Sequence, residues 1–479
     1  MSTFSGLNTA SSALRAQQRA IDVTGQNVAN VNTDGYSRQR VELQSIGANA
    51  VPAIYSVSTG IGEGVSADQV TRIRDAFLES RAQVEHATSA RLTVQSDTLS
   101  QVEDAFREPG ETGIQSELTE MWSGWDDVAN APDNLASRSQ LLERAETLAA
   151  GIRTTSAALT TQWDNTKESL GALVSDVNAT ATSIANLNKA IKTATQAGLP
   201  TNELSDQRDV LVLSLSDKIG ATSTVGDFGT VNVSVGGASL VTGSSALKLG
   251  VTGGTSAAAA GTTPVAIVTV PGNTSLRVDG TAAGQLDALN ATIPDYLGKL
   301  NDFATSLATQ VNTAHRAGSD LAGQGGADLF GSAEGGELTA ANISVKITRP
   351  EELAASRTTT TSPGTTTGTG TLDGSNADAL SQLGSKIGPD GTRGLDSTYR
   401  EMITALGVQA SVATRNVGIQ AVITSQVDTS RESVSGVSLD EEMTSMLAYQ
   451  HGYSAAARMV TTIDEMLDQL INRTGRVGL

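Results

Sequence analysis

Apolar residues near the start of the chain recur at every seventh position, at Leu7, Leu14, Ile21 and Val28. This spacing places them along one line of an α-helix, as in a coiled-coil seam. The positions beside that line hold mainly alanine, glutamine and threonine, so the apolar stripe is narrow and the helix alone is marginally stable in water. The pattern therefore predicts an N-terminal helix that ends near Asn30 and needs a partner.

A broader apolar pattern lies near the end of the chain. Two lines of residues with seven-residue spacing, offset by three positions, form an a/d seam; they are Met446, Tyr453, Val460 and Leu467, and Tyr449, Ala456, Ile463 and Leu470. Ser438 precedes this helix and Glu441 follows three residues later, which predicts a capping box. We expect the two terminal helices to pack together as a coiled-coil inner domain made of residues 1–45 with 438–479.

The middle of the chain has two kinds of sequence pattern. Helical spacing of apolar residues predicts an elongated helical rod domain made of residues 46–217 with 286–437, in which Trp122, Trp125 and Trp163 are core anchors. Between these stretches, residues 218–285 alternate apolar and polar positions and contain many glycines, which predicts an inserted β-rich outer domain. The predicted fold class is mainly α with a β-rich insertion. A Thr-rich stretch at 358–371 is expected to be a solvated loop.

The segment NVANVNTDGYSRQR, residues 27–40, combines the features of a turn. Asn27, Asn30 and Asn32 tolerate left-handed backbone conformations, and Asp34-Gly35 is a strong turn signal. The alternation of Val41 and Leu43 with charged residues after the turn predicts a short strand. Turn chemistry accounts for this composition, so we interpret the segment as a structural joint rather than a catalytic loop.

Charge and composition exclude several classes of function. The chain has 479 residues and a net charge of -19, and an acidic surface is repelled by nucleic acid and by anionic membranes. It contains no cysteine and three scattered histidines, so we expect no disulfide, no metal site and no cofactor. No secretory signal peptide, membrane-spanning apolar run, GxSxG or HExxH motif is visible, and we expect no catalytic site.

Four segments carry a resemblance to a known family. ANVNTDGYSRQ, residues 29–39, resembles the N-terminal signature of the flagellar rod, hook and hook-associated proteins, through Asn30, Asn32, Thr33, Gly35, Tyr36, Ser37, Arg38 and Gln39. Its YSRQ ending is most similar to the hook-associated proteins of the first junction between hook and filament. ELSDQRDVLVLSLSDKIG at 203–220, the region from GQLDALN to GSDLAGQGG at 284–326, and the last helix at 437–472 are similar to the same proteins.

The resemblance implies a fold and a function. Members pack their terminal helices in an innermost tube and carry a helical rod and outer β-rich domains. The ends of the chain are typically disordered before assembly. They form homo-oligomeric rings, contact the hook protein and the second hook-filament junction protein, and leave the cell unfolded through the type III export apparatus with a chaperone. The expected location is therefore extracellular, at the junction. The second junction protein, a flagellin and, least favoured, a secreted wall-cleaving enzyme stay open as alternatives.

Overall fold

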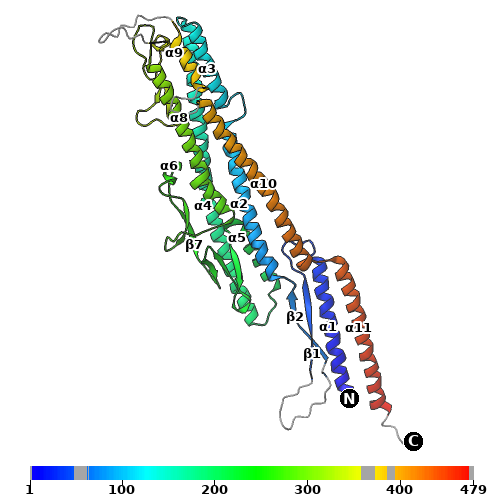
Figure 1. Ribbon diagram of the computed structural model, residues 1–479. Helices are drawn as coiled ribbons and strands as arrows, with labels where there is room; N and C mark the ends of the chain where they lie inside the picture. The colour runs from blue at the N-terminus through cyan, green and yellow to red at the C-terminus, as the bar shows by residue number, and fades with distance from the viewer. Residues whose placement is uncertain (1–2, 48–61, 63, 358–372, 386–393, 474–479) are drawn as a thin grey trace, which may run out of the picture. The chain divides into compact units, whose positions relative to one another are not determined.

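The computed structural model describes residues 3–47, 62, 64–357, 373–385 and 394–473, and it is mainly helical (Figure 1). The Thr-rich stretch at 358–371 lies outside these residues. The α-helices are α1 (Thr3–Ala29), α2 (Ala76–Phe106), α3 (Ile114–Asn130), α4 (Leu135–Gln196), α5 (Asn202–Ile219), α6 (Ala257–Ala260), α7 (Gly280–Asp287), α8 (Ile293–Arg316), α9 (Ser375–Ser381), α10 (Leu395–Ser435) and α11 (Leu439–Asp468). The predicted fold class, mainly α with a β-rich insertion, is confirmed.

The strands pair in small antiparallel sheets. They are β1 (Gln39–Ile46), β2 (Gly64–Arg72), β3 (Thr222–Val225), β4 (Val231–Val235), β5 (Ala238–Thr242), β6 (Ser245–Ala246), β7 (Lys248–Thr252), β8 (Ala266–Val270), β9 (Gly318–Ser319), β10 (Phe330–Ser332), β11 (Ile343–Val345) and β12 (Ser356–Arg357). β1 pairs with β2, and β3 to β6 form a four-stranded sheet in sequence order. β7 pairs with β8, β10 with β11, and β12 with β9.

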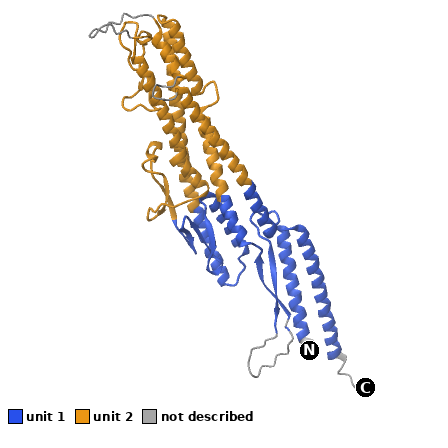
Figure 2. Ribbon diagram, viewed as in Figure 1, with its two compact units in different colours: residues 1–86, 179–247, 422–479 blue, residues 87–178, 248–421 orange. Residues whose placement is uncertain are grey.

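The chain divides into two compact units (Figure 2). Unit 1 comprises Met1–His86, Ala179–Leu247 and Val422–Leu479, and unit 2 comprises Ala87–Asn178 and Lys248–Ala421. The helices α2, α4 and α10 each contribute residues to both units. The 218–285 region expected to be one inserted domain is divided between them, since β3 to β6 belong to unit 1 and β7 and β8 to unit 2.

The terminal helices lie side by side, and α1 also packs on the β1-β2 hairpin (Figure 1). The buried face of α1 is made of small residues, Ala16, Ala20 and Val23, which form one cluster with Val41 of β1 and Ala67 of β2. This line differs from the seven-residue line expected from the sequence, because α1 has two neighbours to cover. The small side chains let both neighbours approach the helix closely.

The core of unit 2 is anchored by aromatic side chains. Trp125 and Trp163 are fully buried and Trp122 is 7% exposed, which confirms their prediction as core residues. The Trp163 indole N–H donates to the Leu289 carbonyl at 2.9 Å, so its polar atom is satisfied. His315 is also fully buried; its Nδ1 faces the Ala327 carbonyl at 2.6 Å, and its Nε2 accepts from the Ala354 N–H.

Candidate functional site

The turn after α1 is held in place by its own backbone geometry and by α5. Gly35 has φ 77°, a conformation that side chains with a Cβ rarely adopt. A Cβ at Gly35 would also overlap the Cγ2 atom of Val210 on α5. The glycine of the turn is therefore required twice, once for the backbone conformation and once for the close approach of α5.

Asn27, in the last turn of α1, connects three parts of unit 1. It is 1% exposed, and its Nδ2 donates to the Gln39 carbonyl and to Oε2 of Glu442, both at 2.9 Å. Its Oδ1 accepts from the Gln39 N–H at 3.0 Å and from the Tyr36 hydroxyl at 2.8 Å. Burial, aided by Asp206 and Glu442, raises the pKa of Tyr36 to about 12, so the hydroxyl keeps the proton that it donates. All the hydrogen-bonding capacity of this buried amide is used.

Arg38 joins the turn to the start of α11. Its Nε donates to Oε1 of Glu442 at 2.7 Å, and its Nη1 donates to Oε2 of Glu441 at 2.6 Å. Its backbone N–H donates to the carbonyl of Ser435 at the end of α10. Ser438 does occupy the N-cap position, but its side chain makes no capping hydrogen bond, so the predicted capping box is wrong. Glu441 pairs with the guanidinium of Arg38 instead.

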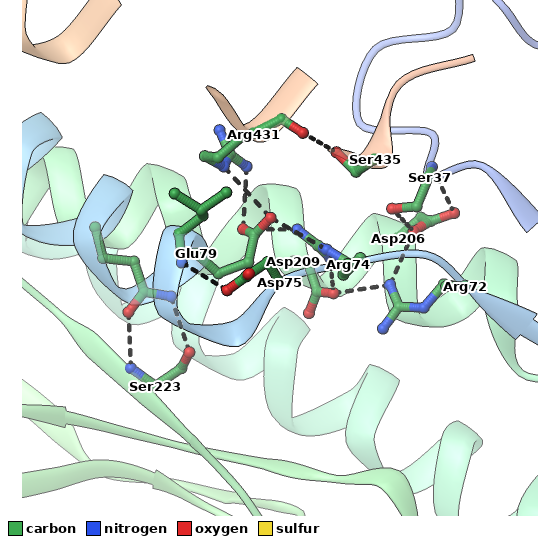
Figure 3. A network of polar contacts seen from close by, with 12 residues as sticks. Ser37, Arg72, Arg74, Asp75, Glu79, Asp206, Asp209, Ser223, Arg431 and Ser435 are labelled. Carbon is green, nitrogen blue, oxygen red and sulfur yellow. Dashed lines mark hydrogen bonds and ion pairs between the residues drawn. The ribbon is translucent and has the colours of Figure 1, made fainter. Parts of the chain in front are cut away.

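Asp206 and Asp209 of α5 form the centre of a second set of contacts (Figure 3). Asp206 is 6% exposed; its Oδ1 accepts from the Ser37 hydroxyl at 2.8 Å and from Nη1 of Arg72 at 2.8 Å. Asp209 accepts from the same Nη1 of Arg72 at 2.8 Å and also from Arg74. The turn, the end of β2 and α5 are therefore joined by two carboxylates on one helix face.

The ion pairs continue from Arg74 to the end of α10 (Figure 3). Glu79 on α2 pairs with Arg74 at 2.8 Å and with Arg431 at 3.1 Å, and Arg431 also contacts Asp428 at 3.1 Å. His86 completes this set, because it faces Asp428 with one ring nitrogen and Asp217 of α5 with the other. These contacts join residues 27–39, residues 72–86, α5, the end of α10 and the start of α11. We call this set of contacts the polar joint.

His86 is the histidine of the polar joint, and its pKa is raised above the ordinary value. The hydrogen bond with Asp217 raises the pKa of His86 most strongly, burial opposes the rise, and Asp428 adds to it. The protonated imidazole donates to both carboxylates at 3.1 Å. The pKa of this histidine therefore lies above its ordinary value because the positive form has two acceptors in place.

The arrangement is suited to holding chain segments together. The charged groups of the polar joint point at one another, and an open groove of about 940 Å³ runs beside them, lined in part by Asn32, Asp209 and Glu432. Within the described ranges, no group of three or more His, Cys, Asp or Glu side chains could hold a metal ion. None of the helices in the described part of the chain is both long and apolar enough to cross a membrane.

The residues expected in the terminal seam differ in exposure. Ala456 and Ile463 are buried, and Gly6 of α1 lies against the Ile463 side chain. Tyr453 and Leu470 are exposed, at 41% and 53%. The remaining expected seam residues are half-buried: Leu7, Leu14, Ile21, Val28, Met446, Tyr449, Val460 and Leu467.

The residues of the 29–39 motif also divide by exposure. Ser37 and Gln39 are buried and make the contacts of the joint. Half-buried positions are Asn30, Tyr36 and Arg38, and exposed positions are Asn32, Thr33 and Gly35. The sequence did not predict that Asn27, Arg72, Arg74 and Glu442 take part in the polar joint. The one available signal was the DQRD segment, which supplies Asp206 and Asp209.

Known proteins are similar to this sequence along the whole chain. A family model described as the flagellar hook-associated protein FlgK helical domain matches residues 99–330. The flagellar basal body rod FlgEFG protein C-terminal model matches 430–473, and the flagella basal body rod protein model matches 7–36. Flagellar hook-associated protein 1 of Bacillus subtilis strain 168 is 32% identical, with 100% of this chain and 99% of that protein covered. The chain belongs to the flagellar hook-associated protein 1 family.

Other members of the hook-associated protein 1 family are more distant but equally complete. The Escherichia coli K12 protein is 26% identical, with 97% of this chain and 99% of that protein covered. A solved structure, the flagellar hook junction protein FlgK from Burkholderia pseudomallei, aligns with a TM-score of 0.64 and 18% identity, covering 74% of this chain and 100% of that chain. The latter likeness supports the fold. The resemblance to flagellar rod, hook and hook-associated proteins is confirmed.

Proposed function

We propose that this chain is a structural component of the bacterial flagellum and joins the hook to the filament as the first hook-filament junction protein. The observation that carries the proposal is the match to hook-associated protein 1 over the full chain, including both terminal helices. The flagellins and the second junction protein are set aside, since the relatives that match the full chain are hook-associated proteins 1.

The terminal helices are the proposed assembly element. α1 and α11 pack together, yet α11 still exposes Leu439, Met443 and Leu447 along one face, at 48%, 57% and 56%. Apolar side chains at such spacing are covered when a neighbouring helix packs on them. We assign this face, with the half-buried seam residues, to contacts between subunits of a homo-oligomeric ring.

The polar joint holds the terminal helices together at one end, where α1 ends and α11 begins. The ion pair between Arg38 and the buried Glu442, and the hydrogen bond from Asn27 to the same carboxylate, hold the end of α1 against the start of α11. The second ion pair of Arg38 is to the exposed Glu441. The proposed partners are the hook protein on one side, the second junction protein on the other, and an export chaperone and the type III apparatus before assembly. The proposed location is extracellular, and neither nucleic acid nor a membrane is a partner. We propose no enzymatic activity, so purified protein should leave peptidoglycan intact.

Deletion of the gene tests the proposal. Cells without the chain should carry hooks with no filament and should release flagellin into the medium, and immunogold labelling should place the wild-type chain at the junction. Because loss of the second junction protein gives a similar phenotype, the bare hooks are also probed for that protein, which should be missing from them. Filaments of normal length on the deletion strain would refute the junction role.

Substitutions in the terminal helices test the assembly element. Leu14→Asp or Val460→Asp introduces a charge into the half-buried contact between α1 and α11 and should abolish assembly. The helical domain should stay folded, as read by circular dichroism of the purified full chain. Ser183→Asp, at an exposed position of α4 in unit 1, is the matched control and should assemble normally.

A further inference from the structure

Unit 2 carries a groove that no segment of the described chain fills. It lies between α2 and α4, has a volume of about 760 Å³, and is lined from Val94 to Ala105 on α2 and from Ala158 to Ser169 on α4. Small and aliphatic side chains form part of its lining, and Asp97 and Asp104, both exposed, stand along one side. Two amide oxygens at the groove, Oε1 of Gln162 and Oε1 of Gln285, are buried without a hydrogen-bond donor from the described residues.

The same unit carries an exposed apolar stripe on α10. Val408, Val412 and Ile419 are 59%, 37% and 54% exposed. At about 100° per residue they fall within one narrow sector of the helix, and Arg415 falls in the same sector between them. Arg415 is exposed as well. An apolar helix face with one central cation is the surface expected of a helix that packs into an acidic groove.

The stripe and the groove are complementary in length and in charge. Residues 408–419 of α10 and residues 94–105 and 158–169 of the groove each cover eleven steps, on the order of 17 Å of helix. A guanidinium offers five N–H donors, and the groove offers the carboxylates of Asp97 and Asp104 and two amide oxygens that lack donors. Val94, Ala105 and Ala158 provide the aliphatic surface for the valine and isoleucine side chains.

The two surfaces face in opposite directions within unit 2. α10 contacts α2 through Thr414, whose hydroxyl lies 3.4 Å from the Ser96 hydroxyl, and through Gly407 beside Glu103. On α2, Ser96 and Glu103 lie about 140° and 160° around the helix from the middle of the groove-lining sector. The buried face of α10, with Leu406 and Ala410, is likewise opposite to its exposed stripe. One copy therefore cannot place its own stripe in its own groove.

We propose that the α10 stripe of one copy of this chain docks in the α2-α4 groove of the next copy. Because the two surfaces differ and lie on opposite sides, the contact is head-to-tail, and repetition of such a contact generates a closed ring or a helical row of subunits. This inference rests on the proposed homo-oligomeric function and assigns the contact between its helical domains. It is separate from the contact of the terminal helices.

Cysteine cross-linking tests the proposal, since the natural chain contains no cysteine and gives no background. Ile419→Cys is combined with Ala105→Cys in one full-length variant and with Val94→Cys in another, because these positions mark the two ends of the groove. Flagella isolated from cells that make each variant are oxidised with copper phenanthroline and probed by immunoblot without reductant. One of the two pairs should give a ladder of dimers, trimers and larger species, and which pair does so fixes the direction of the docked helix.

Controls separate the alternatives. Ile419→Cys combined with Thr313→Cys, an exposed position of α8, should stay monomeric, as should each single-cysteine variant. Dimers from Ile419→Cys alone would show stripe against stripe and overturn the head-to-tail contact. Monomers from both groove pairs, in flagella that contain the chain, would overturn the inference and leave the junction function intact. Absence of the wild-type chain from flagella would overturn both.

A charge exchange gives a second readout that does not depend on cysteine. Arg415→Glu in the α10 stripe should cause loss of the cross-linked ladder and of attached filaments, because the groove already holds two carboxylates. Adding Asp97→Arg and Asp104→Arg to that variant should restore both. All three side chains are exposed, so circular dichroism of the purified variants should match wild type. Failure of the exchange to restore filaments in correctly folded protein would contradict the proposed pairing.

Discussion

Asp209→Asn is the most direct perturbation of the polar joint. The carboxylate of Asp209 forms ion pairs with Arg72, Arg74 and Arg208, and its side chain is 19% exposed. Removing one partner of a buried ion pair costs about 3–5 kcal/mol. Each arginine keeps a second acceptor: Asp206 for Arg72, Glu79 for Arg74, and for Arg208 the carbonyl of Gly229 at 2.7 Å. We therefore take the lower end, about 3 kcal/mol, for the free energy of local opening.

Hydrogen exchange followed by mass spectrometry reads this free energy segment by segment. Because about 1.4 kcal/mol corresponds to a factor of ten, backbone amides of α5 should exchange on the order of a hundredfold faster in the variant. The matched control on the same helix is Asp217→Asn, whose side chain is 43% exposed and pairs with His86, and its effect should stay within about tenfold. Equal exchange rates in the two variants would refute the view that Asp209 organises the joint.

Three further perturbations address other parts of unit 1. Asn27→Ala removes four hydrogen bonds and leaves the carboxylate of Glu442 short of a donor, so it should lower the stability of the turn by about 3 kcal/mol, measured by exchange of the Gln39 amide in assembled protein. Gly35→Ala should destabilise the same turn through its φ of 77° and its overlap with Val210, and Val210→Ala should restore only part of the loss, read as the fraction of cells with filaments. The pKa of His86 is raised in the folded state, so the contribution of its protonated form to the stability of the fold is complete below pH 6.5, the ordinary pKa, and is lost as pH rises through the raised pKa. The urea midpoint of the wild-type chain should therefore fall over that pH range. A midpoint that depends equally on pH in His86→Gln would contradict this.

The local elements follow closely from local chemistry. α1 ends at Ala29, directly before the predicted turn, and Gly35 in that turn has a φ of 77°. Asn27, Asn30 and Asn32 do not have positive φ, so glycine alone uses the left-handed conformation there. β1 begins at Gln39, where apolar and charged residues start to alternate. These signals are contained within a few residues, so the sequence alone exposes them.

The buried face of α1 could not be chosen from spacing. The line through Leu7 and Leu14 and the line through Ala16 and Ala20 both have helical periodicity, and side-chain size favours the first. In the structure the alanines are buried, at 1% and 2%, because close approach of the hairpin requires small residues there. Only the presence of the hairpin beside the helix decides between the two lines.

The polar joint was hidden by sequence distance. Ser37 and Asp206 are 169 residues apart, and Arg38 and Glu442 are 404 residues apart. Charge patterns report neighbours three or four positions away on a helix, and long-range pairs leave no such trace. The error over the capping box has the same origin, because Glu441 meets a distant arginine that competes with Ser438 for it.

The link between Asn27 and Glu442 has a consequence for the order in which the molecule matures. The two residues are 415 positions apart, so Asn27 stays without the Glu442 acceptor until nearly all of the chain has been synthesised. Closing so long a loop adds little to the final free energy but delays the moment when the contact forms. A chain truncated before α11 leaves Asn27 and Arg38 without these carboxylates. The contact between Asn27 and Glu442 therefore forms only after α11 has been made, whereas the contact between Ser37 and Asp206 needs no part of α11.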